Sequence, residues 1–86
     1  MDENIVYSSN GAITASTVDV NIGKHTRAFY VMNIGTSPIT VTFNNQYTMY
    51  IPGTPSTWAS EYYCFPGDYT SYRCNSAASI SVFATA

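Results

Sequence analysis

The chain has 86 residues, and its formal net charge is −2 at pH 7. Only 9% of the residues are charged, against roughly 25% in ordinary soluble domains. Aromatic residues make up 15% of the chain, which argues against disorder because disordered chains are poor in aromatics and rich in charge. We expect one domain over residues 1–86, since a chain of this length supports a single modest core.

The scarcity of charge has two interpretations. Either the surface is made of Ser, Thr and Asn, which are plentiful, or neighbouring protein covers much of it. The eight tyrosines favour the second interpretation, since tyrosine is common in protein contacts.

The sequence also argues against two kinds of partner, nucleic acid and membrane. Lys24, His25 and Arg27 form the one basic cluster, which is too small an electrostatic footprint for nucleic acid. Polar residues and prolines interrupt every apolar stretch, so no membrane span is expected. The acidic start, Met1–Asn4, lacks the apolar core of a signal peptide, and we expect a complete small product made in the cytoplasm.

The first third of the chain contains two predicted strands. Asn4–Ser8 is a short edge strand, and Ser9-Asn10-Gly11 a turn. Ala12–Ile22 is a longer strand in which the apolar residues lie at odd-numbered positions in the first half and at even-numbered positions in the second. Either a bulge near Ala15–Thr17 reconciles its two halves, or the strand begins in one sheet and ends in another. Residues 23–26 form a polar loop.

Residues 27–44 give the strongest signal and predict a β-hairpin. Its first arm is apolar on both faces, which is typical of a strand buried on both sides, inside the domain or against a partner. Residues 33–38 supply the connection. In the second arm Ile39, Val41 and Phe43 alternate with polar residues, the period of a half-buried strand.

The remaining residues predict further short strands. Tyr47–Ile51 follows a turn at 44–46, and the irregular segment 52–57, with two prolines, is expected to cross between sheets. Trp58–Phe65 and Tyr69–Cys74 pair as a second hairpin, and Ser79–Ala84 closes the chain with Ile80 and Val82 inward. Seven or eight short strands without helical periodicity predict an antiparallel β-sandwich, immunoglobulin-like or jelly-roll-like.

Cys64 and Cys74 flank the turn of that second hairpin. If residues 62–74 pair as predicted, the two thiols could form a disulfide, which would contribute about 3 kcal/mol. Synthesis in a reducing compartment argues against the bond, whereas contact with oxygen after release from a cell would allow the bond to form later. Both states stay open.

No catalytic or cofactor-binding motif is present. The one histidine, His25, is remote in the sequence from the two cysteines, and no further cysteine is present to complete a zinc site. Glu61 lies among aromatic residues, but one carboxylate does not make a glycosidase pair. The glycines are dispersed and form no phosphate loop. We therefore expect no enzyme, no metal and no cofactor.

The tyrosine-rich second half is the candidate for function, because so many rings exceed what a small core can hold. One sheet face or its loops would then form a protein–protein contact. A carbohydrate platform is the alternative, although it usually adds charged or amide groups that are scarce here. The candidate interface residues are Tyr47, Tyr50, Trp58, Tyr62, Tyr63, Tyr69 and Tyr72.

Two resemblances add to these predictions. Residues 30–41, Tyr-Val-Met-Asn-Ile-Gly-Thr-Ser-Pro-Ile-Thr-Val, resemble the Asn-x-Gly-Thr hairpin of immunoglobulin-like domains. The Cys…Trp…Cys pattern of antibody domains is absent, because Trp58 precedes both cysteines.

In overall character the chain resembles small auxiliary proteins of tailed-phage virions, such as capsid decoration or cement proteins: short, poorly charged, Ser/Thr/Tyr-rich, all-β, and with an apolar ending at residues 80–84. The resemblance implies a non-enzymatic virion component, assembled in the host cytoplasm. It would stabilise a protein shell by binding the major capsid protein or neighbouring copies, as a homo-oligomer or bound to the lattice. The alternative is an adhesive, carbohydrate-binding or receptor-binding module of a tail or fibre.

Overall fold

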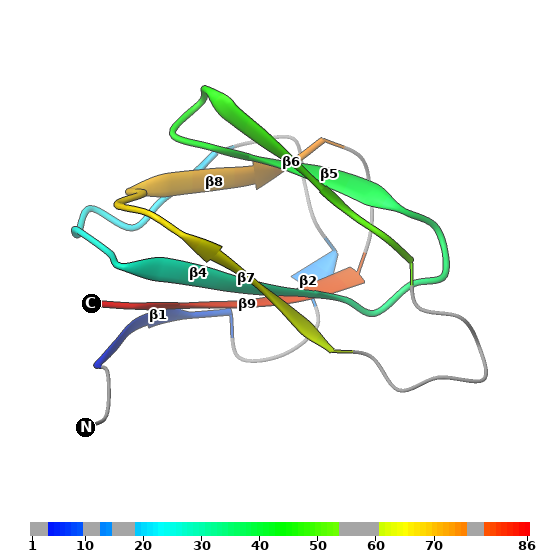
Figure 1. Ribbon diagram of the computed structural model, residues 1–86, viewed down its shortest axis with the longest axis horizontal. Coiled ribbons are helices and arrows are strands. Elements are labelled where there is room, and N and C mark those ends of the chain that lie inside the picture. Colours follow the sequence, from blue (N-terminus) through cyan, green and yellow to red (C-terminus); the bar gives the residue numbers. More distant parts are fainter. Residues whose placement is uncertain (1–3, 10–12, 15–18, 54–60, 76–78) are drawn as a thin grey trace.

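The computed structural model describes residues 4–9, 13–14, 19–53, 61–75 and 79–86, and these form a sandwich of two antiparallel sheets (Figure 1). The first sheet has the order β1-β9-β4-β7, and the two-residue β2 also pairs with β9; the second sheet has the order β3-β8-β5-β6. The strands are β1 (Ile5–Ser8), β2 (Ile13–Thr14), β3 (Val20–Asn21), β4 (Ala28–Asn33), β5 (Ile39–Phe43), β6 (Tyr47–Ile51), β7 (Tyr62–Pro66), β8 (Ser71–Cys74) and β9 (Ser79–Thr85). The predicted β-sandwich is confirmed.

The strand pairing is that of a jelly roll. With β2 set aside, the first strand pairs with the last (β1 with β9), then β3 with β8, β4 with β7, and β5 with β6. This is one long hairpin that has been rolled over so that its successive pairs alternate between the two sheets. Of the two predicted topologies, the structure therefore has the jelly roll and not the immunoglobulin arrangement.

The hairpin predicted over residues 27–44 is wrong. β4 pairs with β7 and β9 in the first sheet, whereas β5 pairs with β6 and β8 in the second. The connection is an arch held by the buried side chain of Asn33: its Nδ2 donates to the carbonyl oxygen of Ser37 at 2.8 Å, and its Oδ1 accepts from the amide of Gly35 at 3.0 Å. This side chain satisfies backbone groups that a two-residue turn would have paired.

The second predicted hairpin, over residues 62–74, is wrong for the same reason. β7 belongs to the first sheet and β8 to the second. Cys64 is exposed on β7, Cys74 is buried on β8, and both are free cysteines. The possible disulfide, which the sequence left open, depended on the hairpin, and it is not formed.

The turn predicted at residues 44–46 is confirmed and joins β5 to β6. Asn44 and Asn45 have φ values of 55° and 54°, and the amide of Gln46 donates to the carbonyl oxygen of Phe43 at 3.0 Å. Positive φ at both central residues defines a type I′ turn, whose twist matches that of a two-stranded ribbon. Asparagine tolerates this conformation better than most residues.

The parity change within 12–22 reflects a strand that switches sheets, which was one of the two alternatives. β2 pairs with β9 in the first sheet and β3 with β8 in the second; the bulge region 15–17 and the Asn10-Gly11 turn lie outside the described residues. β6 and β7 also lie in different sheets, as the predicted crossing requires, although residues 54–60 are likewise not described.

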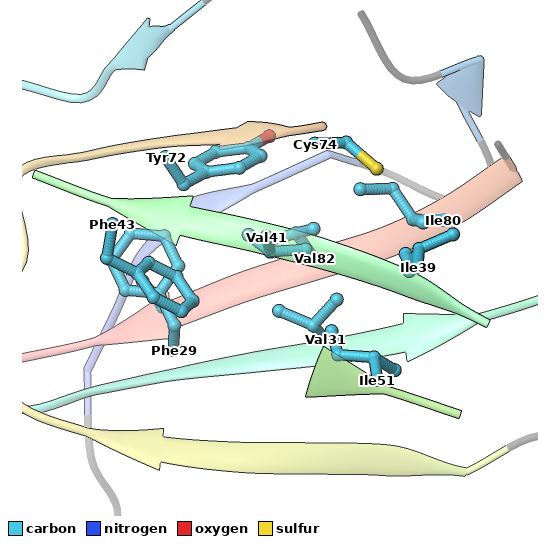
Figure 2. Packing of buried hydrophobic residues seen from close by; sticks show 11 residues of the cluster. Phe29, Val31, Ile39, Val41, Phe43, Ile51, Tyr72, Cys74, Ile80 and Val82 are labelled. Atoms are coloured by element: carbon cyan, nitrogen blue, oxygen red, sulfur yellow. The ribbon is translucent and has the colours of Figure 1, made fainter. Parts of the chain in front are cut away.

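The core lies between the two sheets (Figure 2). Phe29 and Val31 from β4 pack against Val41 and Phe43 from β5, and the two phenyl rings lie 5.1 Å apart. Full burial of such a side chain stabilises a fold by about 1.5–3 kcal/mol. The other members of the buried cluster are Ile39, Ile51, Tyr72, Cys74, Ile80, Val82 and Ala84, which confirms that Ile80 and Val82 face inward.

Candidate interaction surface

The outer side of the first sheet carries aromatic residues where a solvated sheet normally carries polar ones. On β4, Phe29 and Val31 enter the core, so Tyr30 and Met32 point outward. Tyr30 lies opposite Phe83 of β9 and Cys64 of β7, and Met32 lies opposite Tyr62 of β7. Residues directly opposite each other share a face. We call Tyr30, Met32, Tyr62, Cys64 and Phe83 the outer aromatic face.

The rings of this face are ordered by one another. Tyr30 stacks on Phe83 with centroids 4.5 Å apart and an interplanar angle of 9°, and Tyr62 meets Phe83 edge-on at 5.0 Å. The hydroxyl of Tyr62 lies 2.8 Å from the hydroxyl of Ser81. Because the rings of this chain are already fixed, covering them with a partner would cost them little further side-chain entropy.

The outer aromatic face is uncharged and partly exposed. Tyr62 is 43% exposed, Cys64 is exposed, and Tyr30, Met32 and Phe83 are half-buried. The other described outward residues of β4, β7 and β9 (Ala28, Pro66, Ser79, Ser81 and Thr85) are also neutral. Depletion of charge together with enrichment in aromatic residues is typical of the centre of a protein contact.

The outer side of the second sheet has a different character. There Thr42 lies 3.0 Å from the hydroxyl of Thr48, and the amide of Asn75 donates to the hydroxyls of Thr40 and Thr42, both at 2.9 Å. Arg73 forms an ion pair with Asp19 at 3.2 Å. Tyr50, 65% exposed, stands among these polar groups. This face resembles an ordinary solvated surface made of hydroxyl and amide groups.

Tyr72 was predicted to lie in an interface, and that prediction is wrong. It is 2% exposed and forms part of the core. Its hydroxyl lies 2.7 Å from that of Tyr7, and the two rings meet edge-on. Burial raises the pKa of Tyr72, and the hydrogen bond with Tyr7 raises it further. Tyr72 is therefore a structural residue that ties β8 to β1.

The remaining candidate tyrosines do not form one patch. Tyr69 stacks on Phe43 at 4.7 Å and, like Tyr63, is half-buried against the core. Tyr47 is exposed at the start of β6. Tyr50 lies on the second sheet, and Trp58 lies outside the described residues. Of the six candidates that the structure describes, Tyr62 is the one that belongs to the outer aromatic face.

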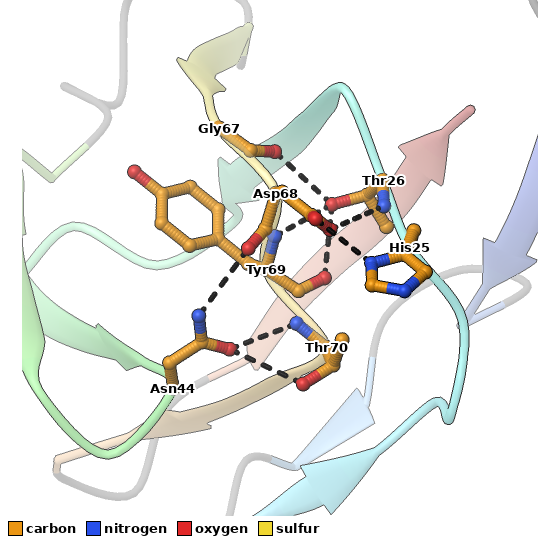
Figure 3. Close-up of polar contacts among 7 residues, drawn as sticks. All are labelled: His25, Thr26, Asn44, Gly67, Asp68, Tyr69 and Thr70. Atoms are coloured by element: carbon orange, nitrogen blue, oxygen red, sulfur yellow. Dashed lines mark hydrogen bonds and ion pairs between the residues drawn. The ribbon is translucent and has the colours of Figure 1, made fainter.

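A polar junction at one end of the sandwich joins three loops (Figure 3). Asp68 accepts hydrogen bonds from the amide of Thr26 at 3.0 Å and from Nδ1 of His25 at 2.8 Å. Asn44 accepts from the amide of Thr70 at 2.8 Å. The bond with Thr26, and secondarily that with His25, lowers the pKa of Asp68. His25 thus pairs with Asp68 while its side chain stays exposed.

This junction offers little for catalysis. Asp68 is engaged by a backbone amide and an exposed imidazole ring, an arrangement that fixes loops. Glu61 is exposed at the start of β7. Within the described ranges, no group of three or more His, Cys, Asp or Glu side chains could hold a metal ion. The described chain also contains no helix long and apolar enough to cross a membrane.

Comparisons with protein-family models, with curated proteins and with solved structures find no match to this chain. The residues themselves therefore carry the functional argument.

The sequence contained a signal for the members of the outer aromatic face that tyrosine counting missed. The apolar character of both faces of residues 28–32 marked Tyr30 and Met32. Phe83 follows Ser79 and Ser81 at alternate positions, so it places an aromatic ring on the face where those two residues are polar. Their convergence depends on β4 lying between β7 and β9, a long-range pairing that local patterns do not specify.

Proposed function

We propose that this chain is a non-enzymatic structural protein of a virion, of the capsid decoration or cement kind, which binds a protein shell through the outer aromatic face. The observation that carries the proposal is a partly exposed, neutral sheet face with ordered rings on a chain that has few charges. Covering such a face removes apolar area from water without desolvating a charge.

The jelly-roll fold is compatible with this function but does not select it. Jelly rolls occur in viral capsid proteins and in lectins, and one fold serves many functions. The composition of the outer aromatic face is what favours one of these functions. A sugar platform needs polar groups beside its rings, whereas the hydroxyl of Tyr62 is already engaged by Ser81, and no outward residue described on β4, β7 or β9 is charged. These features favour a protein partner over a glycan.

The test uses two tyrosines on opposite sheets. Tyr62 on β7 and Tyr50 on β6 are both exposed and both lie on edge strands. Tyr62→Lys places a charge on the outer aromatic face, and Tyr50→Lys places the same charge on the polar face. Each tagged variant is expressed in the cells that assemble the particle, and particles are separated on a sucrose gradient.

We expect the wild-type chain and Tyr50→Lys to sediment with the particles and Tyr62→Lys to stay at the top of the gradient. Circular dichroism of the purified variants checks that both are folded. Wild-type chain that stays at the top of the gradient would overturn the proposal. Folded Tyr62→Lys that sediments like the wild type would overturn the assignment of the face.

A further inference from the structure

Among the described strands, β6 is the edge strand that lacks protection against pairing with another strand. The other edge strands are β1, β2, β3 and β7. The register of β1 shifts at a bulge, β2 and β3 have two residues each, and β7 ends in Pro66. Bulges, short length and prolines are means by which natural proteins protect an edge. β6 contains no charge and no proline, and it pairs with β5 over five consecutive residues without a shift.

The backbone groups of Thr48 and Tyr50 point out of this edge. On β5, the carbonyl oxygen of Thr40 accepts from the amide of Asn75 at 2.9 Å, on the side of β8. Because the backbone groups of successive residues point to alternate sides of a strand, those of the odd-numbered residues of β5 point towards β6. These pair with the odd-numbered residues of β6, so the N–H and C=O groups of Thr48 and Tyr50 point away from β5. Both residues are exposed.

Two copies of β6 satisfy all these groups in one register. If two β6 strands run antiparallel with Met49 of one copy opposite Met49 of the other, Thr48 of each copy lies opposite Tyr50 of the other. Two residues that face each other in this way exchange two N–H···O bonds. The two such pairs use the N–H and C=O groups of Thr48 and Tyr50 in both copies, so none of the outward groups of these residues is left without a bond.

Other arrangements satisfy fewer groups. A shift in one direction places Gln46 opposite Tyr50, although the amide of Gln46 already donates to the carbonyl oxygen of Phe43 at 3.0 Å. A shift in the other direction places Pro52 opposite Thr48, and proline has no amide N–H. In a parallel pairing each residue bonds to the two neighbours of the residue opposite, so the second copy would have to turn its odd-numbered residues outwards. The backbone therefore selects the antiparallel register centred on residue 49.

The side chains of β6 match in the same register, since residues directly opposite each other share a face. Tyr47 lies opposite the core residue Phe43 but is 45% exposed. In the pairing of two copies it would lie opposite Ile51 of the second copy, and the half-buried Met49 would lie opposite its own equivalent. Apolar side chains of the inner layer thus meet apolar ones, and β6 brings no charge into the contact.

We infer that a second copy of this chain pairs with β6 in the antiparallel register centred on Met49, across a two-fold axis. The contact joins the second sheets of the two copies, each of four strands, into one continuous sheet. It lies on a different sheet from the outer aromatic face and leaves that face free. The inference therefore goes beyond the proposed function and does not depend on it.

Removal of one outward N–H tests the edge. Sedimentation equilibrium of the isolated chain should show a concentration-dependent dimer. Thr48→Pro removes an N–H that points out of the sheet, so the ladder with β5 is spared. It should weaken dimerisation by about tenfold or more, because each dimer loses two backbone hydrogen bonds. Thr48→Val loses the same side-chain contact with Thr42 but keeps the N–H, and should dimerise like the wild type. Circular dichroism checks that both variants are folded.

Cross-linking tests the register independently, in a chain that carries Cys64→Ser. Met49→Cys places two thiols opposite each other on the two-fold axis, in a non-hydrogen-bonded pair with Cα atoms about 4.5 Å apart, which a disulfide can bridge. Mild oxidation should then give a covalent dimer on a non-reducing gel. Thr48→Cys is the matched control: its two thiols are offset along the strands and should cross-link about tenfold more slowly or less.

A wild-type chain that stays monomeric up to about 1 mM, a concentration at which even weak contacts form, would overturn the inference. So would a folded Thr48→Pro variant that dimerises like the wild type, or Thr48→Val weakened to the same degree as Thr48→Pro. Cross-linking that is as fast at residue 48 as at residue 49 would overturn the register. Particle sedimentation separates this inference from the proposed function, because a wild-type monomer that still sediments with particles overturns the dimer alone.

Discussion

The hydroxyls of Tyr7 and Tyr72 lie 2.7 Å apart and join β1 of the first sheet to β8 of the second. Burial, followed by this hydrogen bond, raises the pKa of Tyr72 above its ordinary value of 10.0. The fold therefore favours the neutral phenol. The stabilisation is fully present below the unfolded-state pKa and is lost as the pH rises above it towards the folded-state value.

In the Tyr72→Phe variant, the free energy of unfolding should therefore depend less on pH in the alkaline range. Its free energy of unfolding, measured in urea from about pH 8 to pH 11, should fall less steeply than that of the wild type, since phenylalanine binds no titratable proton. The matched control is Tyr50→Phe on the exposed polar face, which should keep the wild-type slope. Equal slopes for Tyr72→Phe and the wild type would contradict the role of Tyr72.

Gly53 should not tolerate a side chain. A Cβ atom at this position would collide with the backbone carbonyl of Thr36 in the β4–β5 arch, whereas at Gly35 it would meet only the Oδ1 of Asn33 at 3.5 Å, an ordinary contact. Gly53→Ala should therefore lower the free energy of unfolding by about 2 kcal/mol or more, because backbone has to move. Gly35→Ala should cost less than half as much. Equal costs in urea unfolding would show that the arch does not pack against residue 53.

The junction at Asp68 should contribute to stability only above acidic pH. Its pKa is lowered in the folded chain from 3.8, mainly by the amide of Thr26 and then by His25. The stabilisation is present above the unfolded-state pKa and is lost as the pH falls through the lower folded-state value. Asp68→Asn should therefore melt below the wild type at pH 7, and the gap should narrow at about pH 3. A gap independent of pH would contradict this assignment.

The two cysteines should react differently. Cys64 is exposed on the first sheet, while Cys74 is 2% exposed in the core. A thiol reagent applied to the dilute native chain should titrate one group quickly, and a second group should appear only in denaturant. Cys64→Ser should remove the fast group. Absence of any free thiol in the freshly purified chain would instead indicate a disulfide.

The sequence predicts strands better than it predicts their partners. Alternation of apolar and polar residues located Ile39–Phe43, and asparagine's tolerance of positive φ located the Asn44-Asn45 turn. Alternation does not distinguish two strands that pair side by side from two that face each other across a core. Residues 27–44 and 62–74 satisfy both arrangements locally, and the pairing of distant strands such as β4 and β9 decides between them.

The candidate site shows the same limit. Counting tyrosines could not tell Tyr72, which faces the core, from Tyr62, which faces outward, because both lie in short strands flanked by polar residues. The orientation of Tyr72 follows from its pairing with Phe43 and Val20, each of which also faces inward. The outer aromatic face exists because three strands distant in the sequence bring Tyr30, Tyr62 and Phe83 together.

The reactivity of Cys64 tests the central claim most directly, because this thiol lies within the outer aromatic face, opposite Tyr30. Its alkylation rate should be measured in the dilute free chain and in purified particles that carry the chain. If the face is a protein contact, the rate should fall by about tenfold or more in the particles, since a covered thiol is shielded from reagent. An equal rate in both samples would show that the face remains open to solvent and would contradict the account.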